Sequence, residues 1–362
     1  MSESSDELTA ISVRNQILLE RLKSGEYKKF APFLRRIERG VRNRIGDEGD
    51  TIATKKRLNV LLTDVQRIQK EIYDEYIAQL NGDLGSIAVS QSEFEANSYN
   101  KVVANYNATV PAAEQVLAAV RLNPMQIENY AGVPLLESFM KDWTKKETVR
   151  VTSAIQQGYY QGLTNSEIVR SIRGTKANNY RDGLLDITNR GANTMVRTSV
   201  QHAASQAQQA AMKANSDLVK GYKIVVTFDS RTTNLCRSLG QLNETYEIGK
   251  GPTPPLHNGC RDAISAVLSE KFDFLDEGAT RASKGAEGGE QVDAKLGSYD
   301  WLKTQPESFQ DAAIGPVRGK LLRDGGLTST EYARLSLSKS LDPLTLDEMR
   351  KLSPSAFERA GI

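Results

Sequence analysis

The sequence predicts a mainly α-helical protein with one small α+β module in its second half. Apolar residues recur every three or four positions through much of the first 217 residues, which is the period of an amphipathic helix. That period breaks at residues 222–228, YKIVVTF, where β-branched and aromatic residues predict a strand. Helix-start patterns return after residue 298. Together these observations place a compact strand-containing module between a long helical region and a helical tail.

The same patterns divide the chain into segments. Residues 278–297, GATRASKGAEGGEQVDAKLG, are rich in Gly, Ala and charge and have no periodicity, so we expect a flexible loop there. The expected order is an N-terminal helical region, extended or bundled, at 1–130, a helical core at 131–220, the α+β module at 221–277, the loop at 278–297 and the helical tail at 298–362.

Individual helices are indicated by apolar stripes and by their ends. Residues 58–80 carry one apolar stripe, typical of a helix packed in a bundle or hairpin, with a coiled coil as the alternative. Gly82 and Gly85 are expected to stop this helix. The pattern T-x-x-E, a capping box, predicts three helix starts, at Thr164/Glu167, Thr328/Glu331 and Thr345/Glu348.

Composition excludes several protein classes. The formal net charge of +2 does not argue for strong nucleic-acid binding by the chain as a whole. No apolar run approaches the roughly 20 residues of a membrane helix, and the start, MSESSDELTA, is unlike a signal peptide. We therefore expect assembly in a reducing cytosol, where two cysteines do not make a disulfide scaffold.

One basic segment stands out against the neutral total. Residues 21–44 hold nine basic side chains and two acidic ones. Such a helical face contacts a polyanion or an acidic protein surface, although a solvated helix face has the same appearance. The candidate contact residues are Arg35, Arg36, Arg39 and Arg42.

The residues best suited to chemistry lie between positions 228 and 262. Cys236, His257 and Cys260 are three ligands that zinc prefers, and H-x-x-C lets two of them hold one ion from a tight turn. Asp229, Asp262 or water would supply the fourth ligand. Two alternatives stay open, a disulfide between the cysteines and two buried, unlinked thiols.

Asp229 and Arg231 predict a structural clamp. An aspartate at a strand end accepts backbone N–H groups of the following turn, or pairs with a guanidinium in a two-bond fork. No second carboxylate lies nearby in the sequence to make Asp229 a catalytic acid. His202 has no second ligand at helical spacing, so we assign it to core or surface.

FDSRTTNLCRSLGQ followed by PPLHNGCRD resembles the motif of the phage Mu protein F-like family, the minor head or head-morphogenesis proteins of tailed phages. The preceding helix, VRTSVQHAASQAQQAAMKAN, and the tail after residue 299 are similar to that family too, so the resemblance covers roughly residues 150–335. The matching motif and tail positions include Asp229, Arg231, Thr232, Cys236, Pro254, Pro255, His257, Cys260, Arg261 and Trp301.

The chain departs from the family at two positions. Thr233 and Asp262 stand where many relatives have further cysteines. Those relatives have a complete metal set, and this chain keeps a reduced one. The resemblance therefore implies either a zinc site with fewer thiols or a fold held by the aspartate–arginine clamp and the Cys/His turn alone.

What the resemblance implies is a structural role. Its members are virion proteins, present in several copies inside or at the head near the portal vertex and assembled in the host cytoplasm. The expected partners are the portal protein, the major capsid protein or both, and packaged DNA, with no membrane contact before infection. We expect a part in head assembly, DNA packaging or DNA delivery, with an ejected, DNA-contacting internal virion protein as the alternative.

Enzymatic activity is not expected. A nuclease site would cluster His, Glu or Lys side chains, and the two histidines lie 55 positions apart. The stretch TSTE at 328–331 lacks the E-x-E partner of an ADP-ribosyltransferase, and a capping box explains it.

Overall fold

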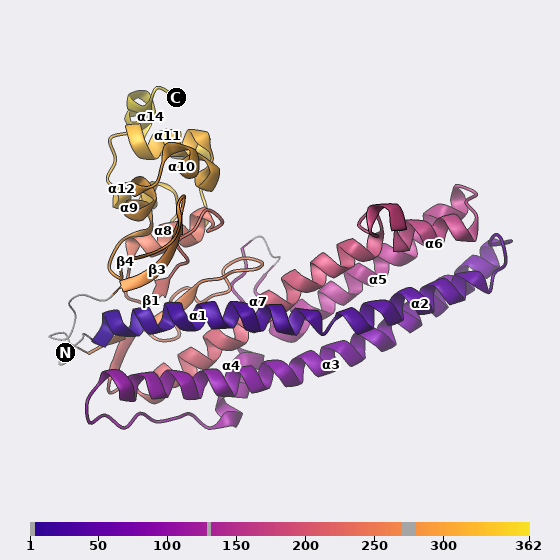
Figure 1. Ribbon diagram of the computed structural model, residues 1–362, viewed down its shortest axis with the longest axis horizontal. Coiled ribbons are helices and arrows are strands. Elements are labelled where there is room, and N and C mark those ends of the chain that lie inside the picture. Colours follow the sequence, from indigo (N-terminus) through magenta and orange to yellow (C-terminus); the bar gives the residue numbers. More distant parts are fainter. Residues whose placement is uncertain (1–3, 129–131, 270–279) are drawn as a thin grey trace.

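The structure, a computed structural model, describes residues 4–128, 132–269 and 280–362. It has a long arm of helices and, at one end of the arm, a smaller α+β region that extends to the side (Figure 1). The C-terminus lies at the far tip of this side region, and α1 passes beneath the strands (Figure 1). The mainly α-helical fold class with a small α+β module is confirmed.

The arm is built around an aromatic core. The rings of Phe30 and Tyr76 lie 4.9 Å apart between centroids, and those of Tyr73 and Trp143 lie 5.4 Å apart in an edge-to-face pair. All four side chains are buried. The arm comprises α1 (Ser4–Lys28), α2 (Ala31–Gly46), α3 (Lys55–Val102), α4 (Ala113–Leu122), α5 (Leu136–Tyr160), α6 (Asn165–Arg173), a 3₁₀ turn at Lys176–Asn178 and α7 (Leu184–Ala214).

The prediction that Gly82 and Gly85 end a helix was wrong, because α3 continues through both to Val102. Leu84 and Ala88 extend the buried stripe beyond the glycines. Each glycine costs about 1 kcal/mol relative to alanine in a helix interior, which packing of the long stripe outweighs. At position 85 a Cβ atom would lie 3.1 Å from Leu117, so the glycine also lets α4 approach closely.

One apolar core spans the boundary expected near residue 130. It runs continuously from Leu19 and Phe30 in the first helices to Ala203 and Ala207 in α7. The N-terminal helical region and the helical core are therefore packed as one body, in which α3 and α7 lie side by side.

The predicted strand at 222–228 is present as β1 (Val219–Val225), shifted three residues toward the N-terminus. It pairs antiparallel with β2 (Ala263–Leu268), which is buried along its whole length. The helix α8 (Asn234–Leu242) follows β1 and packs near it. This sheet and α8 hold the segment in which the cysteines and His257 lie.

The expectation of a flexible loop at 278–297 was wrong for the described part. Residues 278 and 279 lie outside the described residues, but β3 (Thr280–Gly285) and β4 (Gly288–Asp293) form a hairpin. Tertiary contacts override the loop-like composition. Arg281 lies 4.0 Å from the centre of the Phe228 ring, and Trp301 donates a hydrogen bond to Glu290 at 3.1 Å.

The predicted helical tail is confirmed, as are all three capping boxes. In each box the threonine hydroxyl and the glutamate three residues later bond to each other's backbone N–H. Of the helices described, none is both long and apolar enough to cross a bilayer. The tail comprises α9 (Ser298–Thr304), α10 (Glu307–Ile314), α11 (Pro316–Asp324), α12 (Ser329–Leu335), α13 (Leu346–Leu352) and α14 (Pro354–Ala360).

Candidate metal centre

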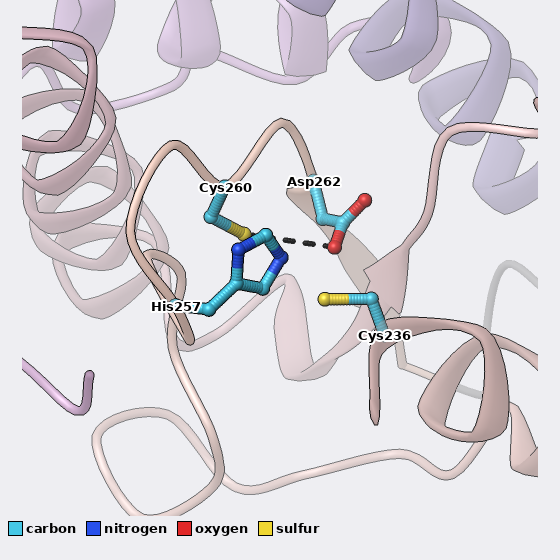
Figure 2. A group of neighbouring side chains, drawn as sticks. All are labelled: Cys236, His257, Cys260 and Asp262. Carbon is cyan, nitrogen blue, oxygen red and sulfur yellow. Dashed lines mark hydrogen bonds between the residues drawn. The ribbon is translucent and has the colours of Figure 1, made fainter. Parts of the chain in front are cut away.

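Four side chains converge between the sheet and α8: Cys236, His257, Cys260 and Asp262 (Figure 2). One donor atom from each lies within 4.8 Å of every other. The two cysteines and Asp262 are buried, and His257 is partly buried. The three ligands predicted from the sequence are thus brought together, and Asp262 rather than Asp229 completes the group.

Local structure fixes each of these side chains. Cys236 lies in the first turn of α8, where its backbone N–H donates to the capping hydroxyl of Thr233 at 3.4 Å. The Cys260 N–H donates to the His257 carbonyl at 3.1 Å, which closes the turn that carries both ligands. Asp262 directly precedes β2, and its Oδ1 accepts the Thr227 N–H at 3.1 Å. The other carboxylate oxygen, Asp262 Oδ2, is left as the atom that contacts the Cys260 sulfur in the cluster.

The histidine is oriented as metal-binding histidines commonly are. Its Nδ1 lies 3.0 Å from the carbonyl of Asn258, so that nitrogen is engaged by the backbone. The other ring nitrogen lies on the side of the ring toward Asp262 and Cys236 (Figure 2). A carbonyl that holds Nδ1–H fixes the tautomer in which Nε2 is the ligand atom.

The four groups perturb one another strongly. Burial would raise the pKa of Cys260, but hydrogen bonds from Cys236 and His257 outweigh it and hold that pKa well below its ordinary value. Burial alone would lower the pKa of His257, and the Cys260 sulfur reverses this, raising it to about 9. Burial and the Cys260 charge raise the pKa of Asp262 to about 7. Without a metal ion, the lowered pKa of Cys260 and the raised pKa of His257 favour a thiolate beside an imidazolium.

The donor set fits zinc. Two sulfurs, one imidazole nitrogen and one carboxylate oxygen are all ligands that Zn²⁺ accepts. Zn–ligand distances of about 2.0–2.3 Å imply ligand–ligand separations of roughly 3.3–3.8 Å in a tetrahedron. The Cys260 sulfur already lies 3.6 Å from Asp262 Oδ2. The other donor atoms are separated by up to 4.8 Å, and side-chain shifts of about an ångström would bring these separations into the tetrahedral range.

Asp229 is used elsewhere, in a fork with Arg261. The two guanidinium nitrogens of Arg261 donate to its carboxylate oxygens at 2.6 and 2.8 Å. Burial would raise the pKa of Asp229, but this fork outweighs it and lowers that pKa. Of the two predicted forms of the clamp, the backbone form is present, because the Arg231 N–H donates to Asp229 at 2.9 Å. The guanidinium fork is made by Arg261 and not by Arg231, whose exposed guanidinium lies 3.6 Å away.

Two helices of the arm hold the turn that carries His257 and Cys260. Lys23 of α1 is fully buried, and its Nζ donates to the Cys260 carbonyl at 3.3 Å and to the Gln201 side chain at 2.6 Å. Thr198 of α7 accepts the Gly259 N–H at 2.9 Å. These contacts could not be predicted from local sequence, because Lys23 is 237 positions from Cys260.

The remaining predicted motif residues support the same turn and strand. Thr232 accompanies Asp229, with 3.2 Å between the hydroxyl and Oδ1. The bond between Pro254 and Pro255 is a cis peptide, in the segment that leads to His257. Trp301 stacks on Phe228 at 5.3 Å between ring centroids. Thr232 and Trp301 therefore contribute to the packing of this region.

Arg237 was missed by sequence reasoning. It is completely buried in α8, and its guanidinium donates to the carbonyls of Asp229 at 2.9 Å and Thr232 at 3.3 Å. These bonds hold the turn after β1 against α8.

The basic segment is partly neutralised. Arg36 pairs with Glu75 at 2.7 Å and Arg42 with Glu38 at 2.9 Å. Arg35 and Arg39 are exposed, and neither has an ion pair among the described residues. A contact of this face with DNA or an acidic protein stays a prediction.

His202 is buried in α7, with Nε2 3.0 Å from the Val120 carbonyl. Burial lowers its pKa to about 4, so it is a neutral core residue at neutral pH. Its assignment to core or surface rather than chemistry agrees with this position.

Comparison of the chain with family models, with curated proteins and with solved structures finds no match in any of the three.

Proposed function

We propose that this chain is a structural minor head protein of a tailed phage, acting at the portal vertex or capsid interior in head assembly, DNA packaging or DNA delivery. The observation that carries the proposal is that the residues of the motif resembling the Mu protein F-like family hold the fold together. Asp229, Arg261, Cys236, His257 and Cys260 form a brace inside the fold. A brace of this kind suits a protein that must hold its shape within an assembly.

We further propose that the brace binds one structural zinc ion through Cys236, His257, Cys260 and Asp262. Structural zinc sites take four protein ligands, whereas catalytic sites keep a position for water or substrate. Four donors are present here, three of them buried. The ion would replace the thiolate–imidazolium contact by metal–ligand bonds and join α8 to the turn before β2.

An enzymatic role has less support. Among the described residues, this is the only cluster of His, Cys, Asp or Glu arranged to hold a metal. Asp229 is tied by both oxygens to Arg261, which removes it as a free general acid or base. A second candidate function, an internal protein that is ejected with DNA, is favoured by the exposed, unpaired Arg35 and Arg39.

The arm suggests how such a protein would meet its neighbours. Its α3 alone has 48 residues, about 70 Å at 1.5 Å per residue. We propose that an arm of this length provides the surface that contacts a neighbouring portal or capsid subunit.

The test is to locate the chain in particles. Heads purified from the phage that encodes it should contain the chain in several copies, and it should co-purify with the portal or major capsid protein. The double variant Cys236→Ser/Arg261→Gln should enter heads poorly, whereas Arg231→Gln should enter normally. Absence of the chain from purified heads contradicts the proposal.

A further inference from the structure

A basic hollow lies where α1, α7 and the turn before β2 meet, next to the metal centre. It has a volume of about 880 Å³. Its lining includes five cationic side chains and one acidic side chain, Glu20. The cations come from three separate parts of the chain: Arg21 and Lys28, Arg197, and Arg231 and Arg261.

Not all of these charges are satisfied within the fold. Arg197 pairs with Glu20, and Arg261 is held in its fork by Asp229. Arg21 and Lys28 are exposed and have no ion pair in the part of the chain that the structure describes. Arg231 is 76% exposed and meets only an Asp229 whose two oxygens already bind Arg261. Arg21, Lys28 and Arg231 are thus three cations of the hollow without an acidic side chain of their own among the described residues.

The row of charge continues along α1. Arg14, Arg21 and Lys28 are spaced by seven residues, and each is exposed. Seven residues make nearly two turns, so the three lie on one face, about 10.5 Å apart along the axis. The row therefore extends the positive charge of the hollow along the exposed face of α1.

The lining favours a phosphate ligand over a protein. Protein interfaces are anchored by aromatic or large apolar side chains, and Ile17 is the one large apolar side chain among the described residues that line the hollow. No aromatic ring is among them, so the hollow offers no platform for stacking a base. Arg, Lys, Ser and Asn side chains are those that contact phosphate oxygens, and Ser24 and Asn193 join the cations here.

We propose that this hollow and the adjoining face of α1 bind the phosphodiester backbone of duplex DNA without reading its sequence. The inference rests on the proposed function only for the source of the DNA, which would be the packaged genome. It differs from the predicted contact at Arg35–Arg42 because it places the binding surface on α1 and the turn beside the metal centre.

The test compares two triple variants that remove the same charge. Arg21→Gln/Lys28→Gln/Arg231→Gln neutralises the hollow. Arg121→Gln/Arg181→Gln/Lys213→Gln neutralises three exposed cations elsewhere, none with an ion pair among the described residues. Binding of two labelled 20-base-pair duplexes of unrelated sequence is measured by fluorescence anisotropy across a salt series. A melting curve checks that both variants are folded.

We expect both duplexes to bind equally, with a slope of log K against log salt of about −3 to −4, from roughly four phosphate contacts. The hollow variant should bind at least tenfold more weakly at 50 mM salt and lose about three units of that slope. The control variant should keep most of the affinity.

Three results overturn the inference: no duplex binding at 50 mM salt, equal losses in the two variants, or capture of a polyglutamate peptide in place of DNA. None of them bears on the proposed function, which is decided separately by the presence of the chain in purified heads.

Discussion

The buried ammonium of Lys23 donates a hydrogen bond to the backbone carbonyl of Cys260, 3.3 Å away, and so joins the first helix to the turn that carries two candidate metal ligands. Glu20 and Gln201 satisfy the rest of the ammonium, each at 2.6 Å. Burial lowers the pKa of Lys23, against the opposing effect of Glu20. Lys23 therefore links the arm to the candidate metal centre, beside the bond between Thr198 of α7 and Gly259.

This link predicts a stability effect at a position far from the motif in sequence. Lys23→Met should lower the free energy of unfolding by about 2–3 kcal/mol, because Gln201 and the Cys260 carbonyl lose a buried donor. Urea denaturation measures this. Lys28→Met, on the same helix but exposed, is the matched control and should change the free energy by less than about 0.5 kcal/mol. Equal effects would show that Lys23 does not act through its buried bonds.

The fork between Arg261 and Asp229 predicts a contrast between two arginines of the motif. Arg261→Gln should cost about 2–3 kcal/mol of unfolding free energy, because it leaves a largely buried carboxylate without its two-bond partner. Arg231→Gln removes only an exposed guanidinium and should cost less than about 0.5 kcal/mol. The comparison is made by chemical denaturation at neutral pH. A larger loss for Arg231→Gln contradicts the assignment of the fork.

Glu95 predicts a pH dependence of stability. It is buried among Tyr99 and Gln208, and burial raises its pKa to about 7. A carboxyl whose pKa is raised on folding contributes stability that is complete below its unfolded pKa, about 4.3. That contribution is lost as the pH rises through about 7.

Glu95→Gln should therefore match the natural chain near pH 4 and be more stable by about 2–3 kcal/mol at pH 8. Denaturation at a series of pH values measures the difference. Glu93→Gln, two residues away and exposed, is the control and should follow the natural chain throughout. A difference for Glu95→Gln that does not grow between pH 4 and 8 contradicts the burial of an uncharged carboxyl.

The features that the sequence predicted well are local ones. The capping boxes at Thr164, Thr328 and Thr345 need only residues three positions apart, and all three form. The strand near residue 222 follows from its β-branched run. His257 and Cys260 share one turn, so their proximity also follows from their spacing in the sequence.

The features that it did not predict depend on distant partners. Arg231 is nearer to Asp229 in sequence, but the chain returns to the end of β1 just before β2 begins and there places Arg261 opposite the carboxylate. The same return decides between the two aspartates predicted as a fourth ligand, because it brings Asp262, and not Asp229, to the cysteines. The hairpin at 280–293 forms because Phe228 and Trp301 hold it, although its own composition is that of a loop.

We propose that the motif holds the fold together around one metal ion, and the metal content of the purified protein tests this most directly. Protein purified under reducing conditions with zinc supplied should hold one zinc per chain by elemental analysis. Cys236→Ser and Asp262→Asn should lose it, and Asp229→Asn should retain it, because Asp229 is outside the ligand group. A chelator should lower the melting temperature of the natural chain alone. A natural chain without zinc, melting at the same temperature with and without chelator, contradicts the claim.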